Sequence, residues 1–428
     1  MSAFLSATAA RSGGRCGLSS LGKSVQDRDL WLVTVGNASA PHFPDPAYPS
    51  VPYPKPKFVY IGAMHGDETG NLVVLLRLLE ELCGDTSRDA RVQLYVVPCM
   101  NPDGYVLGQR WNAHDVDLNR NAFTDDDFPY ARPKLDELSS FDAEAYFFLT
   151  AGGTHMEPET QAITSWLSSL RPTLSANLHG GALVASYALD ACDSLGRDMS
   201  CDSVEAPLPR FLANAYALQH PDMPRSRSDP DGWGRFVNGT TQGARRVRGA
   251  GARGGRGEGG GWLGEGDGWY TALGTLADWA HWAMGHHMLT LELHETKDPP
   301  PGPGLARLYA ANRASLLRLA EMSHLGMRSV VLDAATQAPL AAWTALDGPA
   351  GMWPPQADAA GYIWKLGVPG VTYSGVLQPH DPRDPSSRYA SIPFRFRVRP
   401  SWDAAVRGSG IAELAVVRTL LATRLAKK

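Results

Sequence analysis

The pattern that most limits how this chain can fold is a predicted strand, loop and helix in residues 58–83. Residues 58–63, FVYIGA, form an apolar run of strand length, and residues 71–83, NLVVLLRLLEELC, carry leucines and valines at helical spacing. His65 and Glu68 lie on the connection, where an imidazole and a carboxylate with two residues between them can converge on one point. Both groups are good Zn²⁺ ligands. H-x-x-E alone is also common in ordinary polar loops, so the pattern predicts at most half of a zinc site.

The composition describes a globular protein without the charge of a nucleic-acid binder. A chain of 428 residues suits one large domain and a smaller one. A formal net charge of −4 with 20% charged residues gives no basic surface of the kind that binds nucleic acid. The sequence contains no apolar run of about eighteen residues, so no transmembrane segment is predicted.

The N-terminus and the cysteines give weaker signals. Residues 1–21 contain no acidic residue and lack the apolar centre of a secretory signal, so we expect a leader or a truncated N-terminus outside the folded domain. The five cysteines follow no metal-binding spacing, and an odd number cannot all pair within one chain. Cys192 and Cys201 could bridge a loop, which leaves the compartment open.

Strands and helices alternate along the first three quarters of the chain. Further strands are predicted at residues 30–35, 92–98, 173–178 and 288–293, and further helices at residues 159–170 and 304–324. The alternation predicts the α/β class, with a mixed, mainly parallel central sheet flanked by helices. Ligands of such sheets collect beyond the carboxyl ends of the strands. Residues 101–104, NPDG, follow one predicted strand and are expected to form a turn.

Three segments depart from this alternation. Residues 241–268 are rich in glycine and arginine and cannot bury a core, which predicts a disordered insertion in the large domain. Residues 326–400 contain short β-type runs between Gly, Pro and Asp turns, which predicts a small all-β sandwich. Residues 401–428 are expected to be a C-terminal tail, in which residues 411–428 could form a basic amphipathic helix.

Five motifs stand in order along the chain: HGDE at 65–68, NPDG at 101–104, DLNRN at 117–121, SANLHGG at 175–181 and TLELHETKDP at 290–299. Together they resemble the zinc carboxypeptidases of the M14 family, in its N/E (regulatory, carboxypeptidase D-like) branch. The resemblance covers residues 22–325, the expected catalytic domain, and residues 326–400 resemble the transthyretin-like domain of that branch. It implies one zinc ion and an exopeptidase that acts on the C-termini of peptides or proteins.

The resemblance assigns the metal ligands residue by residue. His65 and Glu68 match the family's H-x-x-E, and His179 in ANLHGG matches its third ligand. Three protein ligands leave a fourth position for water, as in catalytic zinc sites. Asp117 in DLNRN matches the carboxylate that holds the first histidine in its ligating tautomer.

The resemblance also assigns the groups that act on substrate. Glu292 in TLEL matches the catalytic glutamate, which takes a proton from the attacking water and hands it to the leaving amine. The residues alone point the same way, because an acid in an apolar strand is costly unless it serves a site. Arg110 matches the arginine that stabilises the oxyanion. Asn119 and Arg120 match the clamp that grips the substrate's terminal carboxylate.

Two more matches concern substrate selection. Tyr270 matches the tyrosine that closes over substrate, and Asp190 matches the aspartate that faces a basic side chain, so the resemblance implies removal of a C-terminal Lys or Arg. The sequence departs from the family where Ala277 replaces a glutamine of the specificity pocket. In the tyrosine loop, Leu273 and Thr275 replace a proline and a glycine.

Two other functions remain open. An aspartoacylase-type deacylase shares H-x-x-E and a later histidine, but DLNRN and Glu292 favour a peptidase. A zinc-pocket protein that binds without catalysis would follow if the glycine-rich insertion distorted the site. The family resemblance implies the secretory pathway or the extracellular space, although no signal peptide is visible in the sequence.

Overall fold

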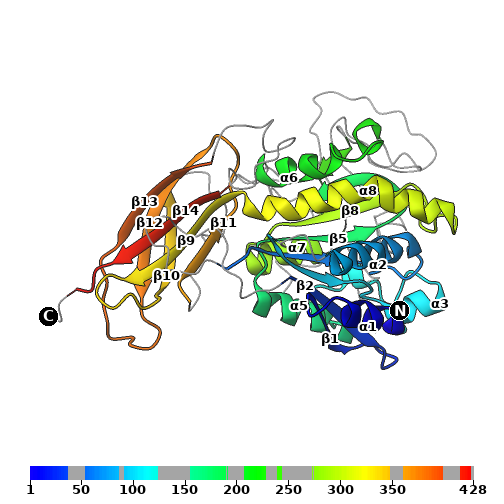
Figure 1. Ribbon diagram of the computed structural model, residues 1–428, viewed down its shortest axis with the longest axis horizontal. Coiled ribbons are helices and arrows are strands. Elements are labelled where there is room, and N and C mark those ends of the chain that lie inside the picture. Colours follow the sequence, from blue (N-terminus) through cyan, green and yellow to red (C-terminus); the bar gives the residue numbers. More distant parts are fainter. Residues whose placement is uncertain are drawn as a thin grey trace, which may run out of the picture.

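An eight-stranded mixed sheet forms the centre of the larger part of the molecule (Figure 1). The computed structural model describes residues 1–36, 54–85, 91–123, 155–188, 190, 207–227, 239–242, 272, 274–347, 360–398 and 415–425. The sheet consists, in spatial order, of β1 (Cys16–Lys23), β2 (Asp29–Val35), β4 (Gln93–Val97), β3 (Lys57–Ile61), β5 (Leu174–His179), β8 (Met288–His294), β6 (Ala182–Tyr187) and β7 (Thr240–Gln242). Parallel pairing joins β3 to β4 and β5, β5 to β8, and β6 to β7. The predicted fold class, α/β with a mixed and mainly parallel sheet, is therefore confirmed.

The alternation of side chains along β3 explains why its sequence is apolar throughout. Phe58 and Tyr60 lie in one hydrophobic cluster, whereas Val59 and Ile61 lie in another. Successive side chains of a strand point to opposite faces, so a strand covered on both faces is apolar at every position. The Tyr60 hydroxyl also donates to the Leu316 carbonyl at 2.6 Å, which ties a covering helix to the sheet.

Helices cover both faces of the sheet. Buried residues of α1 (Ser2–Arg11), α2 (Thr69–Gly84), α6 (Pro207–Ala217) and α8 (Pro303–Glu321) belong to one cluster, and those of α5 (Pro158–Leu170) and α7 (Leu276–Met284) belong to the other. The short helices are α3 (Pro102–Leu107), η1 (Leu118–Arg120), η3 (Met223–Arg225) and η4 (Met322–His324). None of the described helices combines the length and the hydrophobicity that crossing a membrane requires.

The residues after α8 form two three-stranded sheets, which make a separate lobe in Figure 1. One contains β10 (Ala341–Asp347), β12 (Thr372–His380) and β13 (Ile392–Arg397); the other contains β11 (Tyr362–Lys365), β9 (Gly326–Asp333) and β14 (Ala415–Ala422). Val331 from one sheet and Leu377 and Phe396 from the other belong to one core cluster. The short β-type runs of this region therefore form strands, as their sequence predicts.

The C-terminal helix expected for residues 411–428 is wrong, because β14 occupies residues 415–422. β14 runs parallel to β9, with Ala415 opposite Gly326 and Ala422 opposite Asp333. Its sequence, AVVRTLLA, suits either a strand or a helix face, and the backbone pairing with β9 decides between them. The chain from residue 401 onwards is thus not simply a tail that follows the β-region.

The expectation that residues 1–21 lie outside the folded domain is wrong. These residues form α1 and most of β1, and β1 pairs antiparallel with β2. Leu5 is 1% exposed, and Cys16 forms a disulfide with Cys83 at the end of α2. The lack of acidic residues therefore did not indicate a segment outside the fold. The disulfide among the described residues joins Cys16 to Cys83, whereas the sequence suggested a bridge between Cys192 and Cys201.

The NPDG segment begins a helix instead of forming an isolated turn. Asn101 caps α3 by accepting a hydrogen bond from the Gly104 amide at 2.8 Å, and Pro102 occupies the first helical position. Both features are typical of a helix N-terminus. Of the predicted insertion, residues 241–242 belong to β7 and residues 243–268 lie outside the described residues, as do Cys192 and Cys201.

Replacing Cys83 with serine is expected to lower the free energy of unfolding by about 4 kcal/mol, because the Cys16–Cys83 cross-link closes a loop with a sequence separation of 67. Urea denaturation under oxidising conditions measures the difference. As a control, adding a reductant should bring the wild-type protein to the stability of the variant. Equal midpoints for the oxidised wild type and the variant would contradict the prediction.

Candidate metal centre

Neighbouring parallel strands bring the two predicted ligand segments together. His65 and Glu68 lie on the loop between β3 and α2, and His179 is the last residue of β5. In the ladder that joins these strands, Ile61 pairs with Asn177, so both loops leave the sheet at the same edge. The Asn71 side chain in α2 accepts from the Ala63 amide at 2.7 Å, which fixes the start of the His65 loop.

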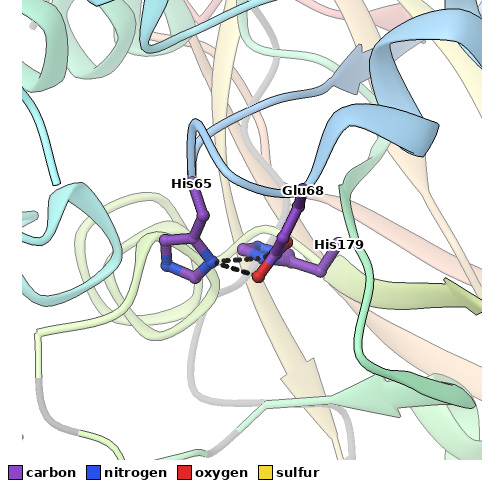
Figure 2. A group of neighbouring side chains, drawn as sticks. All are labelled: His65, Glu68 and His179. Carbon is purple, nitrogen blue, oxygen red and sulfur yellow. Dashed lines mark hydrogen bonds and ion pairs between the residues drawn. The ribbon is translucent and has the colours of Figure 1, made fainter. Parts of the chain in front are cut away.

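The three side chains converge on one point, as Figure 2 shows. Nδ1 of His65 lies 2.8 Å from a Glu68 carboxylate oxygen and 3.1 Å from Nδ1 of His179. Nδ1 of His179 lies 3.0 Å from the other Glu68 oxygen. All three residues are at most 3% exposed.

This arrangement fits a zinc ion. Two neutral imidazoles whose Nδ1 atoms face each other can place only one proton between them, and Glu68 adds a third acceptor. A cation at the centre would bind all three lone pairs. Tetrahedral ligands at normal zinc distances lie roughly 3.3 Å apart, close to the separations found here. His65, Glu68 and His179 could therefore hold zinc with three protein ligands.

Asp117 and Arg110 lie beside the His65 ring. Nε2 of His65 lies 3.2 Å from the Asp117 carboxylate, a contact that favours the tautomer with a free Nδ1 lone pair. Burial disfavours the ionised form of Asp117, but the Arg110 guanidinium and His65 outweigh it and hold the pKa well below its usual range. Nε of Arg110 donates to Asp117 at 2.8 Å, and one terminal nitrogen lies 3.1 Å from His65 Nδ1. A fixed positive charge thus stands at the edge of the centre.

Glu292 stands next to His179 on the neighbouring strand. In the parallel ladder of β5 and β8 the two residues are direct partners. Glu292 is 8% exposed, and one of its oxygens has no hydrogen-bond partner among the described residues. Burial and the nearby Glu68 raise its pKa well above the usual value, against the opposing charges of Arg110 and Lys297. A carboxylate in this position is suited to exchanging a proton.

The predicted clamp and pocket residues meet near the start of α7. Asn119 accepts from the Leu276 amide at 3.2 Å, and one Arg120 guanidinium nitrogen donates to the Asn119 carbonyl at 2.8 Å. Asp190 is half-buried, and its amide donates to Asp278 of α7 at 2.8 Å. Desolvation raises the pKa of Asp190 to about 6, although the Thr275 hydroxyl and the charge of Arg120 pull it down.

Two other predicted positions have different outcomes. Tyr270 lies outside the described residues, so its predicted role stays a prediction. Ala277, predicted to stand in the specificity pocket, is 1% exposed and belongs to the core cluster of α5 and α7.

Sequence reasoning missed two residues around the centre. Lys297 donates to Asp67 at 3.1 Å, which connects the segment after β8 to the HGDE loop. Asn101 bonds to the carbonyls of Met64 and Arg110 at 3.2 and 3.3 Å. Lys297 lies in the motif TLELHETKDP and Asn101 in NPDG. The Asn-Pro pair could have indicated the N-terminus of a helix instead of the turn that was predicted.

A family model described as "Zinc carboxypeptidase" matches residues 1–315 of the chain. Carboxypeptidase SOL1 of Arabidopsis thaliana is 32% identical over 310 residues, which cover 71% of this chain and 50% of that protein. Carboxypeptidase E of Caenorhabditis elegans is 30% identical over 348 residues, which cover 75% of this chain and 66% of that protein. The chain thus spans between half and two thirds of the length of these relatives.

A solved structure supports the fold. Bovine thrombin-activatable fibrinolysis inhibitor, solved in complex with tick carboxypeptidase inhibitor, superposes with a TM-score of 0.51 at 14% identity. The match covers 75% of this chain and 95% of that one.

Proposed function

Because the chain belongs to the zinc carboxypeptidase family, we propose that it is a metal-dependent exopeptidase that removes a C-terminal Lys or Arg from peptides or proteins. The observation that carries the proposal is the grouping of His65, Glu68 and His179 with a buried acid, Glu292, paired to His179 across the sheet. A metal-binding triad and a proton acceptor at the same strand ends suit metal-assisted hydrolysis.

Each step has a candidate group in the chain. One zinc ion bound by the triad would supply a Lewis acid and lower the pKa of a water molecule to about 7. Glu292 accepts the proton of the attacking water and returns it to the leaving amine. Arg110 faces the negative charge that develops on the carbonyl oxygen in the transition state. Asp117 keeps the His65 ring and the Arg110 guanidinium in place through its contacts with both.

The clamp accounts for exopeptidase action. We assign Asn119 and Arg120 to the substrate's terminal carboxylate, because a guanidinium binds a carboxylate through two parallel charge-assisted hydrogen bonds. Asp190 supplies the negative charge that selects a basic side chain. Its electrostatic interaction with Arg120 supports the assignment of Asp190 to a position beside the clamp. Tyr270 keeps its proposed role as the residue that closes over substrate.

Hydrolysis of dansylated dipeptides ending in Lys, Arg, Phe or Ala tests the proposal, with and without a zinc chelator. Chelator-sensitive cleavage of the Lys and Arg substrates is expected. Cleavage of Phe but not Arg substrates would refute the assignment of Asp190. Zinc binding without turnover would favour the non-catalytic pocket protein, and cleavage of acyl-amino acids alone would favour the deacylase.

The selectivity for Arg is expected to fall as the pH is lowered through about 6, because the pKa of Asp190 is raised to about 6 and its carboxylate is protonated below that value. The measurement is the ratio of kcat/KM for Arg and Phe substrates between pH 5 and 8. The ratio cancels titrations of shared catalytic groups. In Asp190→Asn it should be about 10²-fold lower at pH 8 and flat with pH. A pH-dependent ratio in that variant would contradict the assignment.

We also propose the division of the chain and its compartment. Residues 22–325 would be the catalytic domain, extended by the helix and strand of residues 1–21, and the β-lobe would be the transthyretin-like unit, extended by β14. The Cys16–Cys83 disulfide supports the secretory pathway or the extracellular space, since disulfides persist in oxidising compartments.

A further inference from the structure

Asn101 lies where three segments of the candidate site meet. Its side-chain amide donates to the carbonyl of Met64, which precedes the ligand His65, at 3.2 Å and to the carbonyl of Arg110 at 3.3 Å. Its side-chain oxygen accepts from the Gly104 amide at 2.8 Å. Its own backbone amide donates to Ala63 at 3.0 Å. One fully buried side chain therefore joins the metal loop, the start of α3 and the Arg110 loop.

The backbone segments around this junction are in close contact, without room for a side chain at Gly66 or Gly104. A Cβ added at Gly66 would lie 2.0 Å from the Gly104 carbonyl carbon, and one added at Gly104 would lie 2.4 Å from the Trp111 carbonyl oxygen. The Gly66 amide also donates to the Arg110 carbonyl at 3.3 Å. The backbones of the loops are thus in direct contact at this junction, and the side-chain amide of Asn101 donates to both loops.

We propose that Asn101 is a positioning residue that holds the Arg110 loop against the His65 loop. The two amide hydrogen bonds then fix the backbone from which the Arg110 guanidinium reaches to 3.1 Å from His65 Nδ1, while Asp117 holds the guanidinium itself. The inference that Asn101 affects catalysis through Arg110 rests on the proposed function. The inference that Asn101 positions the His65 loop for metal binding does not.

The role requires an amide. An aspartate would keep the bond from the Gly104 amide but has no N–H to offer, and it would face the Met64 and Arg110 carbonyl oxygens. An alanine would leave the Met64 and Arg110 carbonyls without this donor at a position buried from solvent.

The chain offers a matched control in Asn312 of α8. Asn312 is also fully buried, its amide donates to the carbonyls of Leu293 and Leu308 at 3.4 and 3.0 Å, and its oxygen accepts from Tyr216 at 2.7 Å. The hydrogen-bond pattern matches that of Asn101, but these contacts involve none of the site residues. Asn101→Ala and Asn312→Ala should therefore cost similar thermal stability, which separates positioning from general destabilisation.

The experiment measures Zn²⁺ affinity by chelator competition and kcat and KM on an Arg-ending dipeptide. Asn101→Ala and Asn101→Asp should weaken zinc binding about 10-fold and lower kcat about 10²-fold with little change in KM. Asn312→Ala should change neither. Equal zinc affinity and kcat in the two alanine variants would overturn the proposal.

A double-mutant cycle tests whether Asn101 acts through Arg110. If it does, Asn101→Ala should lower kcat far less in an Arg110→Ala background than in the wild type. Additive losses would refute that route. If the wild-type protein hydrolyses none of the peptides, the proposed function fails, and the zinc affinities of the Asn101 and Asn312 variants still decide the inference.

Discussion

Glu292→Gln is expected to lower kcat by about 10³-fold while zinc binding is retained. Glutamine has nearly the same shape as glutamate but cannot accept the proton of the attacking water. Glu292 pairs with His179 across the sheet and is not one of the three side chains that meet at the metal centre, so its replacement should spare the ligands. The measurement is kcat on an Arg-ending dipeptide beside the zinc content of the purified variant.

Glu295→Gln serves as the control for this prediction. Glu295 lies three residues further along, is exposed, and should tolerate the same change without loss of kcat. Normal turnover in Glu292→Gln would show that the proton is taken by another group and would remove the central assignment of the mechanism.

Removal of zinc is expected to abolish hydrolysis and to lower the free energy of unfolding by about 4 kcal/mol, relative to protein in free zinc at about 1,000 times its dissociation constant. The three donors are buried and face one another, so the folded protein binds the ion and the unfolded chain does not hold them together. Thermal or urea unfolding with and without a chelator measures the difference.

His179→Ala should remove this response to zinc, because two ligands remain. His114→Ala is the matched control, since His114 is exposed and pairs with Glu157 at 2.7 Å instead of facing the centre. A zinc response of His179→Ala equal to that of the wild type would exclude His179 as a ligand.

The parts of the fold that sequence reasoning could predict are those in which local pattern and tertiary environment agree. The apolar run of β3 is buried on both faces, and α2 follows with leucines at helical spacing. Parallel strands bring their carboxyl ends to one edge, so His65 and His179 could be placed together although 114 residues separate them. The approach of Glu292 follows from the same rule.

The parts that could not be predicted depend on contacts between distant segments. The sequence of β14 is equally compatible with one face of a helix, and only the pairing with β9 identifies it as a strand. Five cysteines allow several pairings, and only the packing of α1 against both β1 and α2 brings Cys16 to Cys83. The role of Asn101 depends on carbonyls from two other loops, whose positions no local pattern contains.

The pairing of β14 with β9 affects how the protein must be made. A ribosome adding roughly 5–20 residues per second needs about 4 to 18 seconds to pass from β9 to its parallel partner, roughly 90 residues later. During that interval the backbone N–H and C=O groups along the β14 edge of β9 have no strand partner. The β-lobe therefore completes its folding only after residues 415–422 have been synthesised, long after the strands of the metal centre have emerged.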